Sequence, residues 1–132
     1  DEDVYLAGRN IVLVGKAAVV CASRGITRLV LGPLAGNPFP DATPEFFGTM
    51  ARAMSLGLAQ PFHIDTPLAH LHKDAVVRLG LDLGVPLGLT LSCMSPVETT
   101  HCGRCSKCRE RRDAFLDAAC DDPTRYATPP AR

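Results

Sequence analysis

The sequence of 132 residues has no tryptophan, few aromatic residues of any kind and no net charge. Aromatic side chains make up only 5% of the chain, so nucleic-acid bases would find little to stack on, and balanced charges offer no general attraction to phosphates. No apolar run approaches the roughly 20 residues of a membrane-spanning helix. No basic segment followed by an apolar core opens the chain, as a signal peptide would. We therefore expect a cytoplasmic protein with neither a membrane nor a nucleic-acid partner.

The composition that remains is that of an ordinary globular domain, 46% hydrophobic and 21% charged. Its length suits one domain with a core of its own. The first residue is Asp rather than Met, which leads us to expect a segment of a longer protein.

Apolar residues recur with helical period in four segments that we expect to be helices: residues 9–24, 43–56, 73–83 and 106–119. Thr43 followed by Pro44 is a typical helix start, because the hydroxyl caps the first turn and proline fits the first helical position. Gly25 and Gly84 are natural helix stops.

Two short apolar segments, residues 28–32 and 62–64, are typical of buried strands. They alternate with the expected helices, and such alternation predicts a parallel sheet with helical crossovers. Two strands alone rarely make a stable sheet. The sequence therefore predicts an α/β fold that is part of something larger.

Four of the six cysteines lie within sixteen residues, as Cys93, Cys102, Cys105 and Cys108. The last three form two overlapping C-x-x-C units, in which tight turns can point thiolates at one centre, and Gly103 allows the backbone to curl. Cys93 can then complete the four-sulfur shell that tetrahedral zinc prefers. A closed shell has no open position for substrate, so we expect a structural zinc site.

Other interpretations of this cluster stay open: His101 as a ligand, an iron–sulfur cluster, or paired disulfides. The basic residues of 104–112 would offset the charge of four thiolates or contact phosphate. We expect Cys21 to be a small buried hydrophobe and the tail from Asp121 to be loose beyond Tyr126.

The string Ser92-Cys93 followed by Cys102-Gly103-x-Cys105-x-x-Cys108-x-x-Arg111-x-x-x-Phe115 resembles a known family. It is similar to the C-terminal part of the 7-cyano-7-deazaguanine synthases of queuosine biosynthesis, in the N-type ATP pyrophosphatase superfamily. The resemblance extends over about residues 6–118, with shorter matches at Gly8-Arg9-Asn10, at Pro40-Asp41 with Pro44-Glu45-Phe46, and at Thr66-Pro67-Leu68 with Lys73.

The resemblance implies the C-terminal part of a Rossmann-like, adenine nucleotide alpha hydrolase-like domain over residues 1–90. A zinc-binding helical segment over 91–120 and a tail over 121–132 would follow. In that family the four matching cysteines hold zinc. The resemblance leaves open whether the protein is a homodimer.

The family's reaction converts 7-carboxy-7-deazaguanine and ammonia to a nitrile at the expense of ATP, with Mg²⁺ to neutralise phosphate charge. By this resemblance, Arg9 and Lys73 are candidates for contacting phosphate. Asp41 is the candidate for accepting hydrogen bonds from the 7-deazapurine ring.

The chain departs from the family in two places. A Ser-Gly-Gly-x-Asp-Ser phosphate loop is absent from this sequence, so we expect the chain alone to be an incomplete enzyme. The loop over residues 32–41 is short, and Phe39, Ala42 and Met94 stand where the family usually has Tyr, Cys and Tyr. Two alternatives follow: a paralogue that adenylates a different carboxylate, or a zinc-stabilised module that binds nucleic acid or protein.

Overall fold

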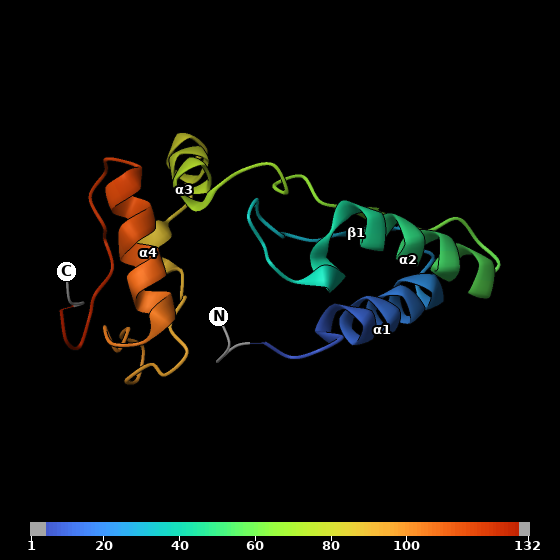
Figure 1. The fold of residues 1–132 in the computed structure, drawn as a ribbon, viewed down its shortest axis with the longest axis horizontal. Coiled ribbons are helices and arrows are strands. Elements are labelled where there is room, and N and C mark those ends of the chain that lie inside the picture. The colour runs from blue at the N-terminus through green and yellow to red at the C-terminus, as the bar shows by residue number, and fades with distance from the viewer. Residues whose placement is uncertain (1–4, 130–132) are drawn as a thin grey trace. The chain divides into compact units, whose positions relative to one another are not determined.

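The computed structural model describes residues 5–129, which form two compact units divided between Leu71 and His72. Figure 1 shows the order of elements, in which helices alternate with the strands of one sheet. The elements are α1 (Arg9–Ser23), β1 (Arg28–Val30), η2 (Pro40–Ala42), α2 (Pro44–Gly57), β2 (His63–Asp65), α3 (Lys73–Asp82), η3 (Leu87–Leu89) and α4 (Ser106–Asp117). The expected α/β class is confirmed at this level. Within residues 5–129, no helix combines the length and apolarity needed to cross a bilayer.

The first unit contains the predicted parallel sheet. β1 and β2 pair in parallel, with Leu29 opposite Ile64, and α2 forms part of the connection between them. The register extends one residue further, because Leu31 N–H donates to the Asp65 carbonyl at 2.9 Å. The two predicted strands are therefore present, each shifted or shortened by one or two residues at an end.

A small apolar core lies between α1, the sheet and α2. Val14, Ala42 and Phe47 are buried at its centre. Six partly buried side chains pack around them: Leu29, Leu31, Phe39, Phe46, Met50 and Ile64. The sheet and the two helices of this unit are thus held together mainly by burial of apolar surface.

Helix α1 is apolar on both of its faces. Val14 and Ala18 face the interior, whereas Val12, Val19 and Val20 on other sides of the helix remain about half exposed. Cys21 is half-buried rather than fully buried as the sequence led us to expect. A helix of this composition is typical of one that is covered from both sides.

The four α-helices of residues 5–129 end in the same hydrogen-bonding pattern, a Schellman motif with a left-handed residue after the cap. At α1 this residue is Gly25 (φ +68°), and at α3 it is Gly84 (φ +68°). At α2 and α4 it is an alanine, Ala59 (φ +52°) and Ala119 (φ +54°). The two glycine stops were predicted; α4 ends at Asp117, two residues before the predicted end.

The start of α2 agrees with its predicted cap. Thr43 Oγ1 accepts from Phe46 N–H at 3.1 Å, and Pro44 occupies the first helical position. This cap satisfies one of the free amides that every helix N-terminus presents.

The segment after α4 is ordered against the cysteine loop. His101 N–H donates to the Arg125 carbonyl at 3.1 Å, and Ala127 N–H donates to the His101 carbonyl at 2.8 Å. The Arg104 guanidinium donates to Thr128 Oγ1 at 3.2 Å. The prediction of a loose tail beyond Tyr126 is therefore wrong for Ala127, which backbone pairing holds, and for Thr128, whose hydroxyl accepts from Arg104.

Candidate functional site

The four predicted cysteines converge on one point in the second unit. Their Sγ atoms all lie within 4.8 Å of one another. The separations are 3.9 Å for Cys93–Cys105, 4.0 Å for Cys102–Cys108 and 3.5 Å for Cys105–Cys108. A tetrahedral ion with metal–sulfur bonds of about 2.3 Å places its sulfurs about 3.8 Å apart. The group can therefore hold a single metal ion such as zinc.

Backbone amides orient the sulfurs. The Sγ of Cys93 accepts from the N–H groups of Ser95 and Cys102, both at 3.3 Å, and the Sγ of Cys102 accepts from Arg104 N–H at 3.4 Å. Such donors stabilise thiolates and fix their direction toward a metal. Part of the charge compensation that the sequence assigned to basic side chains thus comes from the main chain.

Gly103 makes this tight turn sterically feasible. Its φ is +78°, and a Cβ atom at this position would lie 1.6 Å from the Thr128 carbonyl oxygen. Only glycine can accept both the left-handed backbone and the contact with the tail.

The thiols differ in acidity. Burial opposes ionisation of Cys105, but N–H donors from Met94 and Cys108 outweigh it and lower the pKa of the Cys105 thiol to about 6. Burial, with the neighbouring sulfurs, raises the pKa of the Cys108 thiol to about 12. Hydrogen bonds from Arg104 and Cys105 N–H lower the pKa of Cys102. A divalent cation supplies the positive charge that lets all four groups ionise together.

The alternative interpretations of the cluster fit less well. His101 is buried, and its Nε2 accepts from Ser92 N–H at 3.1 Å, so this nitrogen is already engaged. Burial and nearby Arg111 lower the pKa of His101, which agrees with a neutral ring. The sulfur separations exceed the about 2.0 Å of a disulfide bond. They suit one ion better than a multi-iron cluster, which would hold its ligands further apart.

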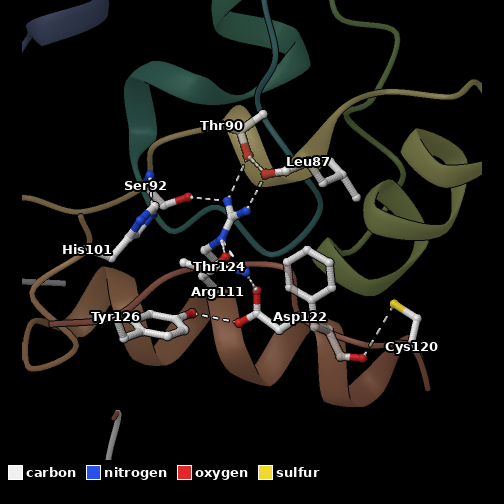
Figure 2. A network of polar contacts seen from close by, with 10 residues as sticks. Leu87, Thr90, Ser92, His101, Arg111, Cys120, Asp122, Thr124 and Tyr126 are labelled. Atoms are coloured by element: carbon white, nitrogen blue, oxygen red, sulfur yellow. Dashed lines mark hydrogen bonds and ion pairs between the residues drawn. The ribbon is translucent and has the colours of Figure 1, made fainter. Parts of the chain in front are cut away.

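Arg111 on α4 ties the second unit together (Figure 2). Its guanidinium donates to the Leu87 carbonyl at 2.7 Å, to Thr90 Oγ1 at 2.9 Å and to Ser92 Oγ at 3.1 Å. It also donates to Thr124 Oγ1 at 2.5 Å. Its side chain is only 8% exposed. One residue thereby links α4, the segment after α3 and the tail.

The spacing of Arg111 in the sequence is a signal for this role. Arg111 lies three residues after Cys108 and four before Phe115, and both of these are buried. A cation on the inward stripe of a helix needs several acceptors around it. The position of Arg111, rather than the basic run as a whole, pointed to a structural role.

Asp41 lies at the start of α1 in the first unit. Its Oδ2 accepts from the backbone N–H of Asn10 at 2.9 Å, and its own carbonyl accepts from Asn10 Nδ2 at 2.8 Å. The carboxylate thus caps the first turn of α1, through a residue 31 positions earlier in the chain. Arg9 is exposed beside it, with its guanidinium 6.0 Å from the centre of the Phe39 ring. The structure therefore brings Arg9 and Asp41 to the same helix end.

Lys73 begins α3 in the second unit, where the helix dipole disfavours a cation. Its ammonium forms an ion pair with the Glu110 carboxylate, which also accepts from Lys107 Nζ at 2.7 Å. Burial opposes ionisation of Glu110, but these two lysines outweigh it and lower its pKa. The ion pair with Glu110 is thus a structural reason for a lysine at this position, whether or not Lys73 also contacts a ligand.

Comparison with known proteins identifies relatives along nearly the whole chain. The family model for queuosine biosynthesis protein QueC matches residues 2–119. A 7-cyano-7-deazaguanine synthase of Thermoplasma volcanium is 37% identical over 96% of this chain and 54% of its own length. Those of Methanopyrus kandleri (37% identical) and Anaeromyxobacter dehalogenans (35%) match 92% and 93% of this chain and 58% and 56% of their own lengths. The chain thus spans about half the length of these curated relatives.

Proposed function

Because the chain belongs to the family of queuosine biosynthesis protein QueC, we propose that it forms part of a 7-cyano-7-deazaguanine synthase. Such an enzyme converts 7-carboxy-7-deazaguanine and ammonia to the nitrile with ATP. The supporting observation is a family match along nearly the whole chain that includes four thiolates placed for one ion. We assign the full reaction to this chain together with a phosphate-binding half, carried on the same or another polypeptide.

The proposed chemistry has two activations. The substrate carboxylate attacks the α-phosphorus of ATP, pyrophosphate leaves, and ammonia displaces AMP from the acyl adenylate to give the amide. A second ATP activates the amide oxygen; loss of AMP and two protons then leaves the nitrile. Both steps develop charge on phosphate oxygens, which cations and Mg²⁺ would stabilise.

We propose three residues of this chain as contacts to phosphate or to the ring of the substrate. Arg9 is an exposed cation available to phosphate at the start of α1. Lys73 would exchange its partner Glu110 for a phosphate oxygen. Asp41 retains acceptor capacity for a purine-like ring beyond its bond to Asn10, because an ionised carboxylate has about four acceptor sites.

We propose zinc as the metal of the cysteine group. Cys93, Cys102, Cys105 and Cys108 would supply four thiolates, and zinc in such a shell stabilises the fold rather than the reaction. We further propose that residues 1–90 belong to a Rossmann-like nucleotide-binding domain, that 91–120 form the zinc segment ahead of a tail over 121–132, and that the protein acts in the cytoplasm.

A paralogue acting on a different carboxylate is the second candidate. It is favoured by the family departures near Asp41, where Phe39 stacks on Tyr5 with ring centres 5.4 Å apart and Ala42 is buried in the core. Changes of this kind next to a proposed ring contact are typical of altered specificity. The balanced charge and low aromatic content give the nucleic-acid alternative no comparable support.

The test is product formation by this chain combined with the phosphate-binding half. Incubation with 7-carboxy-7-deazaguanine, ammonium, ATP and Mg²⁺ should yield the nitrile by mass spectrometry, together with AMP and pyrophosphate. ATP-dependent amide formation on another carboxylate, with none on the deazapurine, would favour the paralogue. No AMP release with any carboxylate would contradict both.

A further inference from the structure

Helix α1 exposes more large apolar side chains than any other helix of residues 5–129. Five of them are 48–58% exposed: Ile11, Val12, Leu13, Val19 and Val20. In α2, the other α-helix of this unit, the only such side chain is Leu56. Val12 and Val19 lie on one side of α1 with Gly15 between them, where an added Cβ atom would meet no neighbouring atom within 4 Å. Contiguous exposed apolar surface of this kind marks an interaction site.

Strand β1, which follows α1 in the chain, has an edge without a neighbouring strand. The Thr27 carbonyl accepts from His63 N–H at 2.8 Å, and Leu31 N–H donates to the end of β2 at 2.9 Å, so these two residues face β2. Backbone groups alternate between the two edges of a strand, and those of Arg28 and Val30 therefore point away from β2. Among residues 5–129 the sheet has no third strand to pair with them.

The two strands differ in the way that interior and edge strands differ. β1 contributes to a continuous apolar run, Leu29-Val30-Leu31, which is typical of a parallel strand covered on both faces, yet Val30 is 59% exposed. β2 alternates polar and apolar residues and is bounded by Pro61 and Pro67, as is typical of a sheet edge. β2 thus suits the outer edge of a larger sheet, and β1 suits its interior.

These features call for a polypeptide neighbour that supplies both a strand and apolar side chains. The chain spans about half the length of its curated relatives, so the other half of such a protein is large enough to fill this role. A second copy of the chain fits less well, because a two-fold axis would pair two β1 edges antiparallel in an otherwise parallel sheet.

We infer that the open edge of β1 and the exposed apolar side of α1 form the docking surface for the phosphate-binding half, an inference that rests on the proposed function. A strand of that half runs parallel to β1 and hydrogen-bonds to the backbone of Arg28 and Val30. Apolar side chains of the same half cover Val12 and Val19 on α1.

The partner in the first test is the part of the Thermoplasma volcanium synthase that lies outside its match to this chain, expressed separately. Sedimentation should show a complex with the zinc-loaded chain. Val12→Asp combined with Val19→Asp should weaken it about a hundredfold, because two carboxylates would be buried in an apolar contact. Leu56→Asp on α2, at a side chain that is 75% exposed, is the matched control and should change the affinity less than about twofold.

Amide hydrogen exchange tests the strand edge directly. The amides of Arg28 and Val30 should exchange quickly in the free chain and slowly in the complex, whereas the His63 amide, which donates to Thr27, should be protected in both. Val30→Pro removes a donor that points away from β2, so it should weaken the complex about tenfold.

The complex of the same partner with the matching part of its own synthase gives the reference affinity. The inference is overturned if this chain does not bind the partner, or if the double aspartate variant binds as tightly as Leu56→Asp. It is also overturned if the amides of Arg28 and Val30 stay unprotected in the complex. A homodimer of this chain that excludes the partner and is broken by the double variant would assign the surface to a second copy instead.

Failure of this inference can be told from failure of the proposed function. A complex that forms as described but releases no AMP and yields no nitrile would keep the docking surface and reject the function. In the product assay, the double aspartate variant should need a higher concentration of the phosphate-binding half to reach its half-maximal rate. Nitrile formation with the same requirement in parent and variant would reject the docking surface and keep the function.

Discussion

The two units of this chain are stabilised in different ways. The unit ending at Leu71 has a parallel sheet and two helices around Val14 and Phe47, with no cysteine in its core. In the unit beginning at His72, most of the large apolar side chains between Leu79 and Val97 are at least one-third exposed. Four thiolates and the hydrogen bonds of Arg111 take the place of a larger core there.

The difference shows how a short segment of about 60 residues can order with few buried apolar groups. Units of this size bury too little surface to be stable without additional cross-links. Two of the buried groups, Cys108 and Phe115, lie on α4 on the same side as Arg111, so one helix carries a candidate metal ligand, the centre of the network and a buried aromatic side chain. Substitutions in the apolar core should therefore destabilise the first unit, and substitutions of the cysteines or Arg111 should destabilise the second.

The largest expected effect is loss of the metal site. Cys105→Ser should unfold the second unit and leave the first folded, because a structural zinc contributes on the order of 10 kcal/mol of apparent folding free energy. Amide hydrogen exchange should show α4 unprotected and α2 unchanged, and a chelator should do the same to the parent. Cys21→Ser is the control. An α4 that stays protected without metal would contradict the structural role.

The next largest effect is expected from a substitution in the apolar core of the first unit. Phe47→Ala removes a side chain that is 3% exposed and should destabilise the first unit by about 3–5 kcal/mol. Exchange in α2 should rise while one zinc per chain remains bound. Leu56→Ala, at a side chain that is 75% exposed, should cost less than about 0.5 kcal/mol. Release of zinc by Phe47→Ala would show that the units are not independently supported.

Arg111→Met should come next, at about 3 kcal/mol, because it leaves several acceptors around Leu87 and Thr124 without their donor. Chemical unfolding at saturating zinc would isolate this loss from metal binding. Arg109→Met changes an exposed cation on the same helix and serves as the control. Equal effects of the two substitutions would mean that the network contributes nothing beyond charge.

The smallest effects concern the helix ends. Ala59→Gly in the first unit and Ala119→Gly in the second should each stabilise by about 0.5 kcal/mol, since both alanines are left-handed. Gly25→Ala and Gly84→Ala should each cost about 1 kcal/mol for the same reason. Melting temperatures would measure all four. If Ala59→Gly and Ala119→Gly both lowered the melting temperature, the Cβ atoms of these alanines would be making contacts that outweigh the backbone strain.

These helix ends also show what could be predicted from the sequence. The ends of α1 and α3 were predicted to within a residue because glycine marks a left-handed position. The end of α4 was predicted two residues late, since Ala119 is a good helix former and nothing local indicates that it is left-handed. The convergence of the four cysteines was predictable because tight cysteine spacing is itself a local geometric constraint.

Contacts between distant residues could not be predicted in the same way. The bond from Asn10 to Asp41 spans 31 positions, and Arg111 finds acceptors 13 to 24 positions away. Such pairs depend on how elements pack, which neither spacing nor propensity encodes. For that reason the sequence indicated neither the bond from Asn10 to Asp41 nor the backbone pairing of Ala127 with His101.

The contact between Gly103 and Thr128 has a consequence for how fast the metal exchanges. We expect an ion held by the four cysteines to leave when the turn between Cys102 and Cys105 opens, and this turn lies against the Thr128 carbonyl. On this hypothesis the tail lifts before the ion departs. The rate of zinc transfer to a strong chelator should level off as chelator concentration rises, at the opening rate of the tail. Thr128→Gly, which removes the hydroxyl that Arg104 holds, should raise that limit.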